Sequence, residues 1–184
     1  MAEIPPVVTC ENVTDEIISK LILMPKKIQS KRKAKPTTKK SEFSLYRYPL
    51  LSHDGIHEFV FLISVHNTIP NKFSVILNYG TKEIKGGVNV FRCNSPHGWG
   101  NPKKDPLHFK NHMHTLLAAD WKSSVTQHLR EKEEAGYQSL KEAITFFVDH
   151  CKIDDDFHVL EDWIAAREES QISLFELVGE NDDE

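Results

Sequence analysis

The stretch IHEFVFLISVHNTIPNKFSVILNY, residues 56–79, indicates the fold class because it holds two strand-like runs separated by turn residues. Ile56 to His66 is rich in β-branched and aromatic residues, and Phe73 to Tyr79 places apolar side chains at alternate positions. Pro70 and Asn71 supply turn chemistry between the runs. The pattern predicts two neighbouring strands of an antiparallel sheet.

Further strand candidates lie on both sides of this stretch. Phe43 to Leu51 is aromatic-rich, Val88 to Cys93 follows two glycines, and Leu107 to Leu116 is the last candidate. Ser95 to Pro106, which is rich in proline and glycine, reads as a loop before that last strand. We therefore predict an antiparallel sheet of about five strands.

Helices are predicted before and after the strands. Thr14 can cap a first helix, and Pro25 ends its apolar stripe. Ser139 and Glu142 form a capping box before a second stripe, and Asp154 to Asp156 can start another helix. The predicted class is α+β, with an N-terminal helix and C-terminal helices packed on the sheet.

Charge divides the chain into segments. We expect an N-terminal helix over 1–25, a basic connection over 26–41, an α+β core over 42–153 and an acidic helical extension and tail over 154–184. The net charge is −4, yet all the charged residues of the connection before position 42 are basic, whereas acids predominate in the extension. The two segments are therefore expected to have separate electrostatic roles.

Several classes of protein are disfavoured by composition. No stretch approaches the roughly 20 apolar residues of a membrane helix, and the N-terminus lacks the features of a secretion signal. Cys10, Cys93 and Cys151 are widely spaced, which argues against a disulfide framework and favours a cytoplasmic protein. The phosphate-loop, dinucleotide, zincin and nucleophile-elbow motifs are missing.

Histidines gather in FRCNSPHGWGNPKKDPLHFKNHMHTLL, residues 91–117. If the last strand candidate forms, His108, His112 and His114 project from the same face of it, and His97 lies in the preceding loop. Imidazole exchanges protons near neutral pH and is the commonest metal ligand in proteins. The pattern therefore indicates a functional site.

Three interpretations of the histidines compete. In the leading one, His97, His112 and His114 cleave RNA by general acid–base catalysis without a metal or other cofactor, and Lys110 or Arg92 stabilises the developing charge. In the second, the same three histidines bind a divalent metal. In the third, they are ordinary hydrogen-bonded residues on a polar sheet face.

The basic connection is the candidate for binding nucleic acid. Its density of positive charge suits a phosphate backbone, and it contains no aromatic residue for base stacking. A solvated surface is the competing interpretation. The residues predicted to bind RNA are Lys26, Lys27, Lys31, Arg32, Lys33 and Lys35.

A non-enzymatic function is the main alternative. The acidic extension carries Phe157, Leu160 and Trp163 at helical spacing, and this face could dock a protein partner. The chain would then act as an adaptor or inhibitor, with a basic nucleic-acid-binding protein as one candidate partner.

The histidine segment resembles the small bacterial proteins related to TumE-type toxins and a neighbouring family of uncharacterised domains. The shared order is an Asn-x-Pro-His element followed by a His-x-His strand and a closing helix, carried here by Asn94, Pro96, His97, His112 and His114. A Met-Pro-Lys-Lys-Ile opening at 24–28 and the helix over 139–153 also fit. The resemblance covers roughly residues 17–153.

This resemblance implies a protein of toxin–antitoxin or phage-defence loci, in which a toxin acts on RNA and an antitoxin neutralises it. Two positions depart from the pattern: Cys93 stands where an aspartate is expected, and Gly98 where a second histidine often follows. The missing acid puts in doubt any mechanism that needs a carboxylate beside the histidines.

Overall fold

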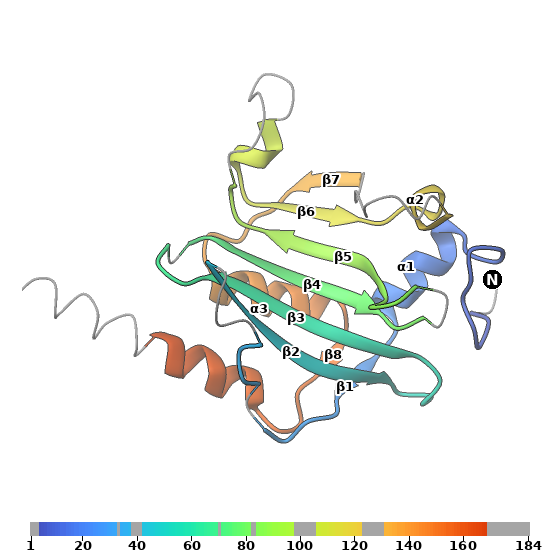
Figure 1. The fold of residues 1–184 in the computed structure, drawn as a ribbon, viewed down its shortest axis with the longest axis horizontal. Helices are drawn as coiled ribbons and strands as arrows, with labels where there is room; N and C mark the ends of the chain where they lie inside the picture. Colours follow the sequence, from blue (N-terminus) through green and yellow to red (C-terminus); the bar gives the residue numbers. More distant parts are fainter. Residues whose placement is uncertain are drawn as a thin grey trace, which may run out of the picture.

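The chain folds as an α+β structure in which one sheet carries helices on one of its faces (Figure 1). The computed structural model describes residues 4–32, 34–37, 42–69, 71–81, 84–97, 106–122 and 131–168. Within these residues no helix has the length and apolar character needed to cross a membrane. The helices and the single sheet confirm the predicted α+β class.

The described elements begin with a helix and a run of strands, and after that run helices and strands alternate along the chain. Their bounds are α1 (Asp15–Leu23), β1 (Lys26–Ile28), β2 (Phe43–Ser52), β3 (Glu58–His66), β4 (Phe73–Tyr79), β5 (Val88–Asn94), a 3-10 helix η1 (Pro106–Phe109), β6 (His112–Thr115), α2 (Ala118–Lys122), β7 (Glu131–Glu134), α3 (Leu140–His150) and β8 (Ile153–Asp154). A last helix occupies residues 159–168.

The sheet has eight strands in the order β7-β6-β5-β4-β3-β2-β1-β8, so the prediction of about five strands is wrong in number. Strands β2 to β7 form an antiparallel meander, and the β1–β8 pair is parallel. The additional strands β1, β7 and β8 are two to four residues long and lack apolar alternation. Such short pieces carry no sequence signal and form because a neighbouring edge offers hydrogen bonds.

The last predicted strand, Leu107 to Leu116, is two elements instead of one. Pro106–Phe109 forms η1, where the Lys110 amide donates to the Leu107 carbonyl at 3.0 Å. The strand begins only at His112. Pro106 cannot donate to a ladder, which is consistent with a turn at this position.

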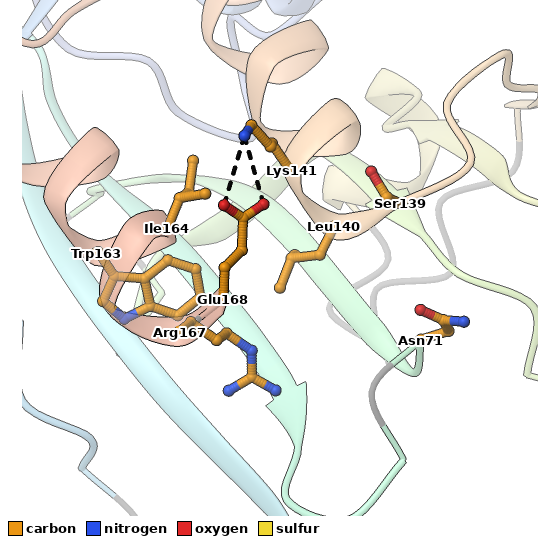
Figure 2. Close-up of a pocket in the computed structure, with 8 residues that line it drawn as sticks. All are labelled: Asn71, Ser139, Leu140, Lys141, Trp163, Ile164, Arg167 and Glu168. Carbon is orange, nitrogen blue, oxygen red and sulfur yellow. Dashed lines mark hydrogen bonds and ion pairs between the residues drawn. The ribbon is translucent and has the colours of Figure 1, made fainter. Parts of the chain in front are cut away.

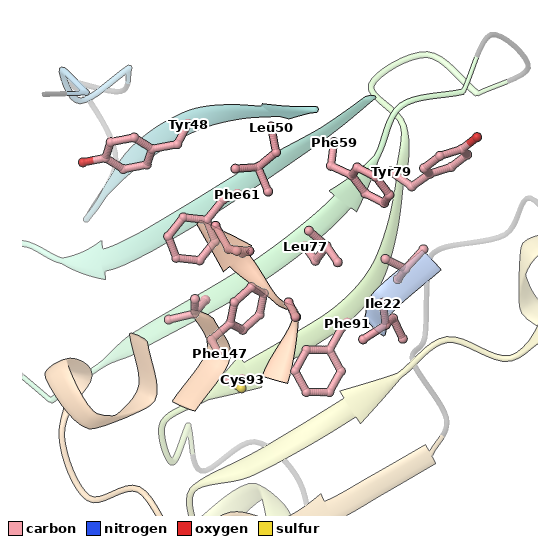
Figure 3. Packing of buried hydrophobic residues seen from close by; sticks show 14 of the residues in the cluster. Ile22, Tyr48, Leu50, Phe59, Phe61, Leu77, Tyr79, Phe91, Cys93 and Phe147 are labelled. Atoms are coloured by element: carbon pink, nitrogen blue, oxygen red, sulfur yellow. The ribbon is translucent and has the colours of Figure 1, made fainter. Parts of the chain in front are cut away.

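Helices α1 and α3 pack against one face of the sheet, as predicted (Figure 1). Thr14 caps α1 by accepting a hydrogen bond from the Ile17 amide, and Ser139 caps α3 in the same way. Phe147 of α3 lies 5.1 Å from Phe61 and 5.5 Å from Phe91, measured between ring centroids (Figure 3). This aromatic packing is the centre of the hydrophobic core.

The helix over 159–168 belongs to the same core, although the sequence placed it in a separate extension. Leu160 and Trp163 are almost fully buried, and the Trp163 ring packs edge-on against Tyr46 at 4.9 Å. The rest of the predicted tail, 169–184, lies outside the described residues.

The face of the sheet opposite α1 and α3 is called the outer face here. In Figure 1 it is turned toward the viewer, and α3 lies behind it. Side chains alternate along a strand, so residues next to core residues in β4, β5 and β6 belong to this outer face. The histidines lie there.

Candidate functional site

Strands β5 and β6 place polar side chains side by side on the outer face. Phe91 of β5 faces the core, where it contacts Phe147 of α3. Side chains alternate along a strand, so Arg92 and Asn94 both lie on the outer face. In the register of the two strands, Arg92 pairs with His114 and Asn94 pairs with His112. The four side chains therefore occupy two successive pairs on the same face, and the Cys93–Met113 pair between them faces the other way.

Four imidazole rings meet at this position. The ring centroid of His97 lies 4.5 Å from that of His108 and 5.1 Å from that of His112, and the last two are 5.4 Å apart. His114 lies 4.7 Å from His112 and 6.3 Å from His108. The structure thus brings the three predicted histidines together and adds His108 to them.

Three of the four can direct a nitrogen atom at a common point. One ring nitrogen from each of His97, His108 and His112 lies within 4.8 Å of the other two. We call these residues the histidine trio. Two of its members are partly exposed, and His112 is completely buried. The trio is therefore anchored on the sheet side and reachable from the solvent side.

The backbone around the trio fixes how its members approach each other. The His97 amide donates to the His108 carbonyl at 3.0 Å, which joins the start of the β5–β6 connection to η1. His112 is the first residue of β6, three residues after the end of η1. The trio is thus built from one strand and from the two described ends of the connection.

The hydrogen bonds of His112 define its tautomer. Its Nδ1 lies 2.8 Å from the Lys110 carbonyl oxygen, and because a carbonyl only accepts, Nδ1 must carry the proton. Its Nε2 is then the atom with a lone pair, and it faces the Asn94 Nδ2 at 3.4 Å. Metal-binding histidines are commonly oriented in this way, by a carbonyl that accepts from the other ring nitrogen.

Tyr137 holds the two strands beneath the site in place. Its buried hydroxyl lies 2.7 Å from the His112 carbonyl oxygen and 2.9 Å from the Asn94 carbonyl oxygen. Burial raises the pKa of the Tyr137 hydroxyl, which keeps it a neutral donor. Tyr137 is therefore a positioning residue for the rung that carries His112.

Arg92 is a mostly buried cation next to this cluster. Its Nη2 donates to the Ser74 hydroxyl at 3.1 Å, and Ser74 donates in turn to Asn94 Oδ1 at 2.7 Å. The Nε–H of Arg92 is buried and has no acceptor among the described residues. Burial lowers the pKa of the guanidinium from its usual value, although arginine stays protonated at neutral pH.

The two cations proposed to assist the histidines differ in their surroundings. Lys110 is half exposed and forms an ion pair with Glu134 at 2.7 Å, so its charge is already compensated. Arg92 has no acidic group beside it within the described chain. Arg92 is therefore the stronger candidate for binding an anion at the site.

Lys26 does not belong to an RNA-binding surface, contrary to the prediction. Its side chain is completely buried, and its Nζ donates to the carbonyls of Ile22, Met24 and Cys151 at 2.7, 2.7 and 3.0 Å. Burial lowers its pKa to about 8. It is a structural cation that ties the ends of α1 and α3 to β1.

The other residues predicted to bind RNA lie far from the histidines. Four of them are exposed, and Lys33 lies outside the described residues; the exposed ones are Lys27, Lys31, Arg32 and Lys35. They belong to β1 and the segment after it, five strand positions from β6. At about 4.8 Å per strand, the distance across the sheet is on the order of 20 Å.

Sequence reasoning missed His108 as a member of the site, together with Ser74 and Tyr137. Strand alternation placed His108 on the same face as His112, but residues 106–109 form a 3-10 helix and not the strand that this argument assumed. Ser74 and Tyr137 are distant in sequence and reach the site only through the register of β4 with β5 and the position of the segment before α3. No local pattern identifies either of them.

The apolar residues of the partner-docking hypothesis lie mostly in the interior. Leu160 and Trp163 are 3% and 6% exposed, whereas Phe157 is 38% exposed and lies under the Lys31 ammonium. A cavity of about 140 Å³ separates this helix from α3, and it is closed on one side by the ion pair of Lys141 with Glu168 (Figure 2). The cavity contains no predicted site residue.

Comparison with known proteins adds no family to this picture. No protein-family model, no curated protein and no solved structure matches the chain. The assignment of function therefore depends on the geometry of the site.

Proposed function

We propose that the protein is a metal-dependent enzyme that holds Zn²⁺ at the histidine trio, His97, His108 and His112. The observation that carries this proposal is the convergence of one nitrogen from each ring within 4.8 Å. In a tetrahedral zinc site with Zn–N bonds of about 2.1 Å, the ligand nitrogens are about 3.4 Å apart. Small rotations of the partly exposed His97 and His108 rings suffice to close the difference.

The donor set favours a catalytic centre over a structural one. Three protein ligands leave a fourth position of a tetrahedral zinc ion for water or substrate, as in known catalytic zinc sites. Neutral imidazoles do not offset the charge of the cation, so it remains a strong Lewis acid and acidifies bound water. The reaction class that suits this arrangement is hydrolytic or transesterifying cleavage.

His114 is the proton-handling group of the proposed centre. It lies beside the trio, 4.7 Å from the His112 ring, and pairs across the ladder with Arg92. An imidazole next to a metal-bound oxygen can receive or return a proton during the reaction. In this role His114 acts next to the cation without binding it.

The first test is the metal content of protein purified without an affinity tag. We expect close to one zinc per chain in the wild type, and a loss of at least about tenfold in zinc affinity in the His108→Ala variant, because it leaves two ligands. His158→Ala is the matched control, since His158 is exposed and pairs with Glu161 away from the site. A metal-free wild type that also fails to bind added zinc contradicts the proposal.

Metal-independent cleavage of RNA is the second candidate function. It is favoured by the direct contact of the His112 and His114 rings, because a base and an acid side by side can deprotonate a 2′-hydroxyl and protonate the leaving 5′-oxygen. This toxin-like activity predicts cleavage that persists in the presence of a chelator and is abolished by the double substitution His112→Ala, His114→Ala. Cleavage that disappears with the chelator and returns with zinc supports the metal centre instead.

A further inference from the structure

The outer face carries a partly buried positive charge, that of Arg92, for which the described chain provides no counter-ion. Among the described residues the Arg92 guanidinium makes one hydrogen bond, to the Ser74 hydroxyl, and its Nε–H has no acceptor. Burial lowers the pKa of the guanidinium from its usual value. The fold therefore retains a cation under conditions in which a charge is normally paired.

This arrangement is unfavourable for stability unless a ligand completes it. An unpaired buried charge destabilises a folded protein, and arginine cannot escape the penalty by losing its proton. Among the other arginines of the described chain, Arg32 and Arg47 are exposed, and Arg167, whose Nε–H is also buried, lies over the Trp163 ring at 6.0 Å. What distinguishes Arg92 from these arginines is its position on the outer face, in the strand that pairs with the strand of His112 and His114.

Arg92 is linked by two hydrogen bonds to Asn94, which lies beside the histidine trio. The Ser74 hydroxyl accepts from Arg92 and donates to Asn94, and the Asn94 amide faces Nε2 of His112. Arg92 and His112 lie on adjacent strands and belong to successive pairs on the same face, two residues apart in the register. Rungs on the same face are separated by about 7 Å, which a single small oxyanion can bridge.

We infer that Arg92 binds a phosphate group of the substrate, which makes the substrate of this centre a phosphodiester. The inference rests on the proposed metal centre for the second contact: one non-bridging phosphate oxygen lies on the guanidinium and the other on the cation of the trio. A phosphodiester provides these two oxygens on one tetrahedral atom. The planar fork of arginine is suited to bind such an oxygen pair, as it is in many phosphate sites.

Carboxylates are the competing ligands because arginine also binds them in a forked geometry. The number of donors favours phosphate. Arg92 and a divalent cation together supply more positive charge than a single carboxylate neutralises, whereas a phosphoryl group under attack gains negative charge. Acetate is therefore the discriminating probe.

The test is a calorimetric titration of the full-length protein with inorganic phosphate and, separately, with acetate. We expect phosphate to bind the zinc-loaded wild type, and Arg92→Gln to weaken this binding at least about tenfold because a charge-assisted pair is lost. Arg47→Gln is the matched control, since Arg47 is an exposed arginine on the same strand-rich domain. Equal phosphate affinity of Arg92→Gln and wild type overturns the inference, and so does tighter binding of acetate than of phosphate.

A second measurement avoids the dependence on a variant that could misfold. In the wild-type protein the Nε–H resonance of Arg92 should shift during titration with phosphate, and a resonance that stays unmoved at saturation overturns the inference. The metal is tested separately. If the protein binds no zinc but still binds phosphate in a way that depends on Arg92, the anion site stands and the metal centre is refuted. If the protein binds zinc but its phosphate binding does not depend on Arg92, the metal centre stands and the anion site is refuted.

Discussion

His108 illustrates how a site can be assembled from residues whose sequence pattern predicts a different geometry. A continuous strand would have placed it on the same face as His112 and two rungs away along the chain. The structure instead turns the chain at η1, so that the His108 ring packs 4.5 Å from that of His97 and 5.4 Å from that of His112. The result is a tighter group than alternation alone could form.

Cys93 occupies the position where the resemblance to TumE-type toxins expects an aspartate. Its side chain is buried in the core, on the face of β5 opposite to Arg92, and burial raises the pKa of its thiol. A cysteine here packs among apolar side chains and stays a neutral thiol. Because Cys93 points into the core, a side chain at this position does not join the imidazoles and the guanidinium of the outer face.

Removal of the Tyr137 hydroxyl should loosen the site from below. In Tyr137→Phe the carbonyls of His112 and Asn94 lose their shared donor, and we expect the free energy of unfolding to fall by about 1–3 kcal/mol because buried acceptors are left unsatisfied. Urea denaturation measures this loss. Tyr46→Phe is the control, and a Tyr137 variant as stable as that control contradicts the positioning role.

At the scale of elements, Lys26 connects three pieces of secondary structure. Its ammonium donates to carbonyls at the end of α1 and at the end of α3 while its backbone pairs in β1. Lysine near helix C-termini also interacts favourably with the negative end of the helix dipole. The local sequence Met-Pro-Lys-Lys-Ile gives no sign of this, because the carbonyl of Cys151 is contributed from the other end of the chain.

Lys26 gives the fold a defined dependence on pH. Burial lowers its pKa from 10.5 to about 8, so between these values the unfolded chain binds more protons than the folded one. The free energy of unfolding contributed by this group therefore rises as the pH increases through this window, and it is lowest below pH 8, where the buried charge is fully present.

The measurement is the difference in unfolding free energy between wild type and Lys26→Met at several pH values. We expect this difference to grow in favour of the wild type as the pH rises from 8 to 10.5, since other titrating groups are common to both proteins. Lys27→Met serves as the exposed neighbour control. A difference that is constant with pH, as for the control, contradicts the role of Lys26.

The long strands and the capped helices could be predicted from sequence, but the edges of the sheet and the site could not. Apolar alternation in β3 and β4 and the caps at Thr14 and Ser139 are local signals, and the structure retains them. Strands such as β7, with the sequence Glu-Lys-Glu-Glu, exist only because β6 offers a partner. Ser74 reaches the site through strand register, which no single segment encodes.

At the scale of the whole molecule, the sheet separates the histidine site from the exposed basic residues. The site lies on β5 and β6, whereas Lys27 and the residues after it follow β1 at the other side of the meander. A nucleic acid held by both would have to cross the outer face over on the order of 20 Å. The basic segment therefore does not contribute side chains to the histidine site.

The helix over 159–168 completes the molecule on its other face. Trp163 and Leu160 join the core that α3 shares with the sheet, and Arg167 stacks over Trp163. The predicted acidic extension is thus partly a structural element of the domain. A role of this segment in binding a partner would have to use its exposed acidic side chains and not its apolar stripe.

Anomalous X-ray diffraction at the zinc absorption edge, from crystals of untagged full-length protein, tests the central claim most directly. The trio predicts one strong peak about 2.1 Å from a nitrogen of each of His97, His108 and His112. It also predicts that His114 and Arg92 lie outside the coordination sphere. The absence of a peak at the outer face after zinc addition, or a peak bound by other residues, would contradict the proposed metal centre.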